Sequence, residues 1–541
     1  MYKTPHRIAL AAFVGLGIAL RISTFDRALW IDEAWVVNSA QSASWREMFF
    51  YSAWIQTTPP GLLSILRLLL TVFDCGIETL RWVPITASVM TLLLFARLAS
   101  RLFKPPAAVL ACAVLAFSPE VIWYGTEVKQ FSFDMLAMLI YLTLGRAYIQ
   151  QPSRQRLWQW GAGYVLSLAF SYTAMFSLPA IAMIAWMQGR GTRAGRRELL
   201  PVVATLALIT ASIYLYFVRP NAGYPNLRQF WIAAFPLTAH QPLQYFFRTV
   251  LNRLFLFTQV DVLAPLRAFI AIAVLVAGAL LCARPAHHRP MAGACLALLV
   301  IVPLVTTGVA NFLGLYPVGD IRLVVFLVPC VLILLVAVFA EMVTRWSMLA
   351  PVQAQQGCEF WSGLVAAMAV TYMLCLSAGL PNWAARSERA VVLWQGTMDV
   401  RPVMSFLHAV DSLHRPVYVQ AYFSQLFKLY TRAHPLAAPV SFAQSGWPCC
   451  IPNQPWRGYG INRDDIALEV DRLVEQFRGQ SIYLLLARYP KHLSNDAAHV
   501  YAELLAAKQC PVTWRWSDRR IEFIKAQCKA KSEDTRVSLS R

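Results

Sequence analysis

Three short segments next to long apolar runs carry acids and bases of the kinds that catalyse group transfer. The first is "RALWIDEAWVVNS" (27–39), in which Asp32 and Glu33 are adjacent and lie between two tryptophans. The others are "SPEVIWYGTEVKQFSFD" (118–134) and "GLYPVGDIRL" (314–323). Their charged residues of interest are Glu127, Lys129, Asp320 and Arg322. Charges so close to the hydrocarbon of a membrane are costly, so we treat them as candidates for function.

This set of residues suits the transfer of a group from a phosphate to a hydroxyl. A carboxylate near the reacting proton can act as a general base, and partial burial raises its pKa toward neutrality. Fixed cations stabilise the charge that develops on a departing phosphate, and the fork of Arg322 can hold two phosphate oxygens. Each residue alone could equally be a charge at the level of the lipid headgroups or a helix cap. Their occurrence together on one side of the membrane favours a site.

The elements that must position these residues are membrane helices. The chain has 541 residues, of which 58% are hydrophobic and 14% charged. Soluble domains are about a quarter charged, so the composition predicts a polytopic α-helical membrane protein. The net charge of +20 is typical of basic cytoplasmic loops, and the chain has no basic-aromatic motif for nucleic acid. A secreted globular protein is excluded, and no nucleic-acid partner is expected.

Clusters of Lys and Arg between the apolar runs set the predicted topology, because cytoplasmic loops carry an excess of both. They give about eleven transmembrane helices, the first of which we interpret as an uncleaved span rather than a signal peptide. The predicted spans are 8–24, 82–100, 105–122, 130–149, 160–175, 177–189, 198–218, 264–284, 291–312, 322–344 and 360–380. Within 25–81 and 240–260 we expect juxtamembrane helices on the outer face, because a span at 59–73 would reverse the charge bias of the following loops.

The polar C-terminal region predicts a small α/β extracytoplasmic domain at 385–528, after a membrane domain at 1–384. The stretches "PVYVQAY" (416–422) and "SIYLLLARYP" (481–490) predict buried strands, "ALEVDRLVEQF" (467–477) a helix and "VTWRWSDRRIEFI" (512–524) an antiparallel hairpin. Residues 529–541 are predicted to be disordered. In this hairpin, Trp514 and Trp516 have strand spacing, which favours packing on a sheet face over binding an acceptor glycan.

Four cysteines lie in this C-terminal region. Cys510 and Cys528 flank the predicted hairpin and could pair if the region faces an oxidising compartment. Cys449 and Cys450 are neighbours, and whether either forms a disulfide is left open. Zinc binding by the four is less favoured, because no histidine lies at ligand spacing.

Five stretches of the sequence resemble, in order, one known family of membrane enzymes. They are "LWIDEAW", "TPPG", "LRWVPITASVMTLLLFARLASRLF", "SPEVIWYGTEVKQFSFDML" and "YPVGDIRLVVFLVP", and they span most of the first 345 residues. The set resembles the integral-membrane glycosyltransferases of the GT-C fold. The most similar branch is the bacterial one related to protein O-mannosyltransferases, lipid A aminoarabinose transferase and the rhizobial lipopolysaccharide-core transferases.

The resemblance implies a reaction, its substrates and its place in the cell. A sugar would pass, with inversion, from a polyprenyl-phosphate donor to an envelope acceptor, which could be a glycolipid, lipopolysaccharide or a protein. The transfer would take place on the outer face of the cell inner membrane, among its lipids. The multi-pass chain would have a cytoplasmic N-terminus and a periplasmic C-terminal domain.

The resemblance also implies a role for each candidate residue. Asp32 would be the catalytic base, Glu33 its helper and Glu127 a further catalytic acid. Lys129 and Arg322 would bind the donor phosphate. The possible acceptor or sugar contacts are Thr57, Thr58, Tyr124, Tyr172, Tyr316 and Asp320. Relatives often have Arg at 129, His or Gln near 57 and 58, and His near 171, and these departures affect the acceptor and sugar contacts more than the reaction type.

No cofactor is expected. Two carboxylates near a phosphate could hold magnesium or manganese, but cations already stand where the charge of the metal would be needed, and no metal ligand is predicted.

The main alternative function is a polytopic transporter or lipid flippase without glycosyl transfer. That alternative predicts internal repeats and charged or broken helices near the midplane, and we find no convincing repeat. An O-antigen ligase or oligosaccharyl transferase would normally have larger outer loops.

Overall fold

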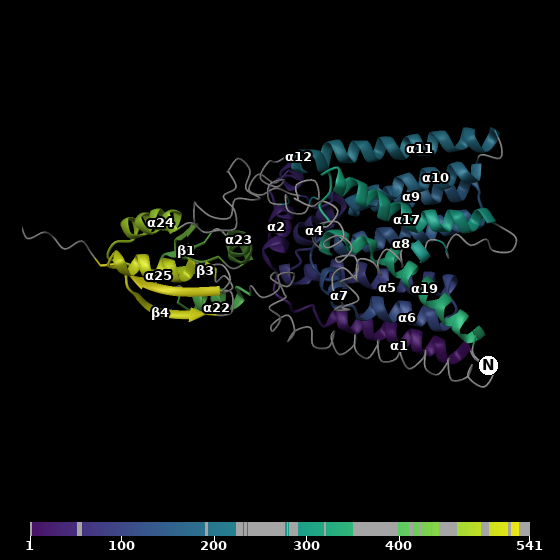
Figure 1. The fold of residues 1–541 in the computed structure, drawn as a ribbon. Coiled ribbons are helices and arrows are strands. Elements are labelled where there is room, and N and C mark those ends of the chain that lie inside the picture. The colour runs from purple at the N-terminus through teal and green to yellow at the C-terminus, as the bar shows by residue number, and fades with distance from the viewer. Residues whose placement is uncertain are drawn as a thin grey trace, which may run out of the picture. The chain divides into compact units, whose positions relative to one another are not determined.

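The computed structural model describes twelve ranges of the chain and a few isolated residues. The ranges are 3–50, 57–189, 193–222, 290–318, 321–349, 399–410, 415–420, 423–433, 435–442, 463–487, 497–517 and 521–529, with 231, 235, 276–278 and 280 in addition. The chain divides into two compact units, which we describe separately (Figure 1). The first comprises residues 1–26, 57–224 and 231–392, and the second 27–56, 225–230 and 393–541.

The described part of the first unit is a bundle of helices (Figure 1). They are α1 (Lys3–Ile22), α4 (Pro60–Thr71), η1 (Ile77–Arg81), α5 (Trp82–Leu102), α6 (Pro105–Phe117), α7 (Pro119–Gly125), α8 (Phe131–Gln150), α9 (Arg154–Phe170), η2 (Tyr172–Ser177), α10 (Leu178–Gly189), α11 (Arg193–Ile213), η3 (Tyr214–Val218), α12 (Arg219–Ala222), α17 (Pro290–Phe312), α18 (Ile321–Val324), η8 (Val325–Leu327) and α19 (Val328–Leu349). Four of them begin at a proline, namely α4, α6, α7 and α17, and at the first helical position the missing N–H of proline costs nothing.

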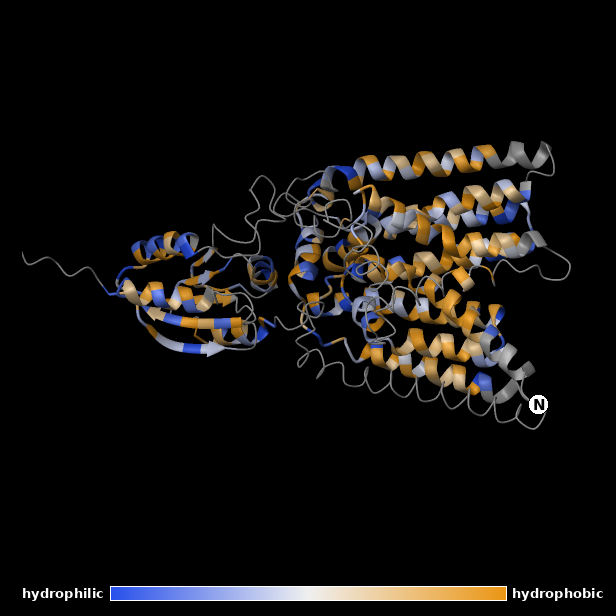
Figure 2. Cartoon of the chain, in the orientation of Figure 1, coloured by the Kyte–Doolittle hydropathy of each residue, from blue (hydrophilic) through white to orange (hydrophobic). Residues whose placement is uncertain are grey.

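Several of these helices are long and apolar enough to cross a bilayer (Figure 2). They are Ile77–Leu102, Phe131–Gln150, Leu200–Val218, Gly293–Phe312 and Arg322–Glu341, and the bent pair Pro105–Phe117 and Pro119–Gly125 forms another if it is counted as one span. The prediction of a multi-pass membrane protein is therefore confirmed, and these spans agree with six of the predicted ones.

The count of about eleven spans stays a prediction. The predicted spans 8–24, 160–175 and 177–189 correspond to α1, to α9 with η2, and to α10, none of which is among the described helices that meet the length and hydropathy of a span. The span 360–380 and the outer helix at 240–260 lie outside the described residues, as does most of 264–284. The predicted outer helix at 59–73 is present as the short apolar α4.

The second unit contains the C-terminal α/β domain. Its elements are α22 (Arg401–Val410), β1 (Val417–Val419), α23 (Ser424–Ala433), β2 (Val440–Phe442), α24 (Arg463–Gln476), β3 (Ser481–Ala487), α25 (Ala497–Ala507), β4 (Val512–Ser517) and β5 (Ile521–Gln527). The strands form one sheet of order β2-β1-β3-β5-β4, in which β2, β1 and β3 are parallel and β5 is antiparallel to both its neighbours. The two predicted strands, the helix and the hairpin are confirmed. The domain boundary near 385 lies outside the described residues, as do 530–541.

Both faces of this sheet are covered. On one face Tyr418, Leu484 and Ile524 pack with α24 and α25 residues such as Val470 and Tyr501. On the other face Phe406 of α22 stacks on Trp514 with their ring centroids 5.0 Å apart, and it also contacts Tyr483 and Phe523 edge-on. Trp514 therefore packs on a sheet face, as its strand spacing predicts.

Two features stabilise the core of this domain. Cys510 and Cys528 form a disulfide across 18 residues, and closing a loop of this length stabilises a domain by about 3 kcal/mol. Cys449 and Cys450 lie outside the described residues.

The buried Glu469 carboxylate accepts hydrogen bonds from the hydroxyls of Tyr418 and Tyr501, both at 2.5 Å. Burial, with the neighbouring Tyr501 and Glu469, raises the pKa of the Tyr418 phenol well above its usual value.

The second unit also contains α2 (Ile31–Ala40) and α3 (Trp45–Phe49), from the segment between α1 and α4. The Asn38 amide on α2 donates to the backbone oxygen of Gln425 at 2.8 Å and to its side-chain Oε1 at 3.1 Å. Gln425 lies on α23, and both residues are buried. The helix that carries Asp32 and Glu33 therefore packs against the C-terminal domain.

Candidate active site

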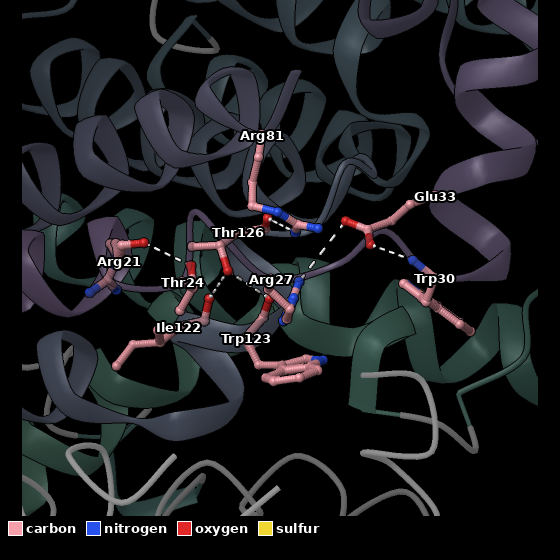
Figure 3. A network of polar contacts seen from close by, with 9 residues as sticks. All are labelled: Arg21, Thr24, Arg27, Trp30, Glu33, Arg81, Ile122, Trp123 and Thr126. Carbon is pink, nitrogen blue, oxygen red and sulfur yellow. Dashed lines mark hydrogen bonds and ion pairs between the residues drawn. The ribbon is translucent and has the colours of Figure 1, made fainter. Parts of the chain in front are cut away.

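The acid pair lies in the first turn of α2. Trp30, at the N-cap, has extended backbone angles, and its N–H donates to Glu33 Oε2 at 3.0 Å (Figure 3). This is one half of a capping box, in which a glutamate three positions into the helix satisfies a backbone N–H of the end. Arg27 Nη2 lies 4.0 Å from Glu33 Oε1, so both oxygens of this fully buried carboxylate have contacts. Glu33 therefore fixes the start of the helix.

Asp32 is the more accessible member of the pair. Its side chain is partly exposed, whereas every other residue from 28 to 40 is buried. An acid in the first turn of a helix is stabilised by the backbone N–H groups there and by the helix dipole. The Asp32 carboxylate thus lies in the first turn of a helix that Glu33 caps, and its partial exposure makes it accessible to a substrate hydroxyl.

Glu127 and Lys129 lie in a tight turn of the first unit, between α7 and α8. Glu127 is fully buried and Lys129 is 5% exposed. The Lys129 N–H donates to the Glu127 carbonyl oxygen at 2.7 Å, and Arg81 Nη1 donates to the carbonyl oxygen of Thr126 at 2.9 Å (Figure 3). This turn is therefore a buried and strongly polar element among apolar helices.

Arg322 begins the span Arg322–Glu341. Its guanidinium lies over the ring of Trp231, 5.3 Å from the centroid, which is within the range of a cation–π interaction. Close by in the chain, the Tyr316 hydroxyl donates to the Leu323 carbonyl oxygen at 2.7 Å, and Asn311 Nδ2 donates to the Tyr316 carbonyl oxygen at 2.9 Å. Asp320 lies outside the described residues.

The proposed acceptor and sugar contacts differ in exposure. Thr58 is 3% exposed and Tyr124 is fully buried, with its ring edge-on to Phe131 at 5.6 Å. Thr57 and Tyr172 are partly exposed, and the Tyr172 hydroxyl approaches the Thr58 carbonyl oxygen at 3.5 Å. Their roles toward a sugar stay predictions.

Sequence reasoning missed four residues of this region, namely Arg21, Arg81, Asp134 and Trp231. Asp134, in the first turn of α8, is 4% exposed, and its Oδ1 accepts from Thr173 Oγ1 at 3.2 Å. An acid inside a predicted span is a signal that could have found it. Trp231, Arg21 and Arg81 contact residues that are distant in the sequence, and such contacts cannot be predicted from a single sequence.

The structure brings the predicted residues together in three local groups. Asp32 and Glu33 share one helical turn in the second unit, and Glu127 and Lys129 share one turn in the first. Arg322 stands with Trp231, also in the first unit. That the three groups form one site stays a prediction. Among the described residues, no three His, Cys, Asp or Glu side chains are arranged to hold a metal ion.

Comparison with known proteins identifies the fold. Residues 57–217 match the family model of dolichyl-phosphate-mannose-protein mannosyltransferases. Two solved structures of the Archaeoglobus fulgidus oligosaccharyltransferase AglB each match 96% of this chain at 12% identity. One, in complex with an inhibitory peptide and a dolichol-phosphate, has a TM-score of 0.50 over 74% of its own chain. Another, in complex with zinc and sulfate, has a TM-score of 0.52 over 73%.

The protein has the GT-C fold. The predicted fold class and the resemblance to GT-C glycosyltransferases are thereby confirmed, and the matched family and AglB are both glycosyltransferases. The structure of ArnT from Cupriavidus metallidurans bound to undecaprenyl phosphate is also similar, at 15% identity and a TM-score of 0.48. The match covers 95% of the present chain and 97% of the ArnT chain. Curated protein sequences contain no match to the chain. The mannosyltransferase match includes the buried turn with Glu127 and Lys129.

Proposed function

We propose that this GT-C protein is an inverting glycosyltransferase that moves a sugar from a polyprenyl-phosphate donor to an acceptor of the cell envelope. The observation that supports this most directly is the buried turn of Glu127 and Lys129, which lies inside the range that matches the mannosyltransferase family. AglB, whose fold the chain shares, was solved with dolichol-phosphate, a lipid phosphate of the donor class proposed here. The acceptor is a glycolipid, lipopolysaccharide or a protein.

In the proposed reaction Asp32 takes the proton of the acceptor hydroxyl. The acceptor oxygen attacks the anomeric carbon from the face opposite the phosphate, and the bond from that carbon to the phosphate oxygen breaks. Its electron pair stays on the phosphate, so polyprenyl phosphate leaves and the anomeric configuration inverts. Lys129 and Arg322 stabilise the charge that develops on this phosphate, and Trp231 holds the guanidinium plane of Arg322.

Glu33 supports Asp32 in this scheme through the helix start that both share. Its carboxylate caps α2 and contacts Arg27, which keeps the first turn in one conformation. Glu127 places a carboxyl group two residues from Lys129, in the same buried turn. Both acids therefore organise the site, while the proton transfer itself belongs to Asp32.

A direct assay tests the proposed reaction. The detergent-solubilised full-length protein is given defined polyprenyl-phosphate sugars and a cell-envelope extract, with its glycolipids, lipopolysaccharide and proteins, from a strain that lacks the protein. Mass spectrometry is expected to show an acceptor heavier by one sugar residue, together with released polyprenyl phosphate. A transporter or flippase has no membrane to act across in detergent and would form no such product. Absence of any product with every donor class would contradict the proposal.

The proposed orientation places the C-terminal domain in the periplasm of a bacterium, with the N-terminus in the cytoplasm. The Cys510–Cys528 disulfide supports it, because disulfides persist in oxidising compartments such as the periplasm. We expect alkaline phosphatase fused after residue 541 to be active and a cytoplasmic reporter fused there to be inactive. The same fusions after Arg101, in a loop predicted to be cytoplasmic, provide the control. The reverse pattern would overturn the orientation and the outer-face site.

A further inference from the structure

Arg21 is a fully buried cation in the last turn of α1. Its guanidinium donates four hydrogen bonds, from Nε to Ser88 Oγ at 2.9 Å, from Nη1 to the carbonyl oxygens of Gly17 at 2.8 Å and Ala116 at 3.0 Å, and from Nη2 to that of Leu115 at 3.1 Å. These acceptors are all neutral oxygens. Removing a charge from water is expensive, and these four hydrogen bonds compensate part of that cost.

Two of the bonds lie at a break in an apolar helical segment. α6 and α7 meet at an angle of 57°. Pro119 has no N–H, so the carbonyl of Leu115, four residues earlier, lacks its helical donor. Ser118 has a ψ of 119°, in the extended region that a residue before proline prefers, and the chain leaves the helical path there. The carbonyl of Ala116 lies in this same interrupted turn.

Arg21 supplies donors to these two carbonyls. The last turn of a helix also carries the negative end of its dipole, which favours a cation. The guanidinium of α1 therefore completes the end of α6, at the point where the segment changes direction.

Small residues make this contact possible. A Cβ on Gly17 would lie 2.8 Å from Ala116 Cβ and 2.9 Å from Leu92 Cδ2, so α1 and α6 approach closely one turn before Arg21. At the end of α7, a Cβ on Gly125 would lie 2.6 Å from Ser88 Oγ, the atom that accepts from Arg21 Nε. Contacts thus run without a gap from Arg21 through Ser88 to the end of α7.

The end of α7 leads directly into the buried polar turn. Gly125 is followed by Thr126, whose carbonyl oxygen accepts from Arg81, and then by Glu127 and Lys129. We propose that Arg21 is a positioning residue, which fixes the direction of α7 and thereby the place of the Glu127–Lys129 turn. The effect on catalysis rests on the proposed function, whereas the effect on the helix break does not.

The test substitutes Arg21→Met, which keeps a long apolar side chain and removes every donor. Hydrogen–deuterium exchange of the full-length protein is expected to become faster in peptides that cover 118–130, with the middle of α8 unchanged. In the transfer assay kcat is expected to fall about 100-fold, the effect of displacing a reacting group by about 1 Å. Arg21→Lys should recover part of both properties, because one ammonium can still donate to a carbonyl. Arg7→Met, an exposed arginine on the same helix, is the matched control and should change neither.

A double-mutant cycle tests the link to the helix break. Pro119→Ala restores an N–H that can donate to the Leu115 carbonyl, so Arg21→Met is expected to accelerate exchange less in that background than in the wild type. Strictly additive effects would overturn the proposal. If Arg21→Met does not accumulate, Ser88→Ala removes a single acceptor, and faster exchange in 118–130 is again the expected result.

The outcomes separate this inference from the proposed function. Unchanged exchange at 118–130 in Arg21→Met, or in Ser88→Ala, would overturn the positioning role whatever the activity. Faster exchange with fully retained kcat would also overturn the positioning role, because sugar transfer would then not depend on the position of the Glu127–Lys129 turn. Faster exchange in a protein whose wild type transfers no sugar would support the role of Arg21 at the break and contradict only the glycosyltransferase function.

Discussion

Asp32→Asn is expected to lower kcat for sugar transfer by about 10²–10⁴-fold, the usual contribution of a general base. Asparagine has nearly the same size and cannot take a proton from the acceptor hydroxyl. Because Asp32 is partly exposed in the first turn of α2 and asparagine keeps its size and polarity, the thermal unfolding temperature should stay within a few degrees of the wild type. Initial rates at saturating donor and the unfolding temperature of the purified protein measure the two effects.

Two variants make the result specific to Asp32. Asp74→Asn is the matched control, because Asp74 is an exposed acid with a φ of 48°, a backbone conformation that asparagine also adopts. It should leave both the rate and the stability unchanged. Glu33→Leu, unlike Asp32→Asn, should lower the unfolding temperature as well as the rate, because it removes the acceptor for Trp30 and the partner of Arg27 and so destabilises the helix start. Wild-type turnover in Asp32→Asn would show that another group is the base.

Arg322→Ala has the second largest expected effect, a loss of about 10²–10³-fold in kcat/KM for the donor. This is the size measured when one fixed donor to a developing negative charge is removed. Arg322→Lys should recover part of the loss, since lysine keeps the charge but lacks the planar fork that binds two phosphate oxygens. Kinetics at varied donor concentration, with acceptor held constant, separate this effect from acceptor binding.

Trp231 extends the test of Arg322. Trp231→Leu keeps apolar volume and removes the ring face over which the guanidinium lies. A cation–π interaction is worth about 0.5–2 kcal/mol, so the variant should show a smaller loss, of about 2–30-fold, in kcat/KM for the donor. In an Arg322→Ala background Trp231→Leu should have little further effect. Arg101→Ala, at an exposed arginine at the end of α5, should leave donor dependence unchanged. Donor kinetics that are unaffected in Arg322→Ala would remove this residue from the phosphate site.

Properties that depend on neighbouring residues could be predicted from the sequence. Apolar runs predicted five described helices that are long and apolar enough to cross a bilayer, and a sixth if the bent pair is counted as one span, because length and hydropathy determine whether a helix can span. Short apolar runs predicted two buried strands of the C-terminal domain and alternating residues predicted its hairpin, which Cys510 and Cys528 flank. The Ser118–Pro119 pair lies within the predicted span 105–122, but the prediction did not include the bend.

The organisation of the candidate site depends on contacts that join distant parts of the chain. Asn38 and Gln425 are 387 residues apart, and only the packed structure shows that α2 and the C-terminal domain belong to one unit. Arg21 and Ala116 are 95 residues apart, and in the sequence Arg21 is only a charge at the end of an apolar run.

The sequence by itself determined which segments are apolar, where acids and bases interrupt them and which family the chain resembles. Only the tertiary structure decided that Glu33 caps a helix while Asp32 stays accessible, and that Arg322 lies over Trp231. The physical reason is that hydropathy and local periodicity act along the chain. Burial and the partner of each polar group, in contrast, depend on which helices pack together.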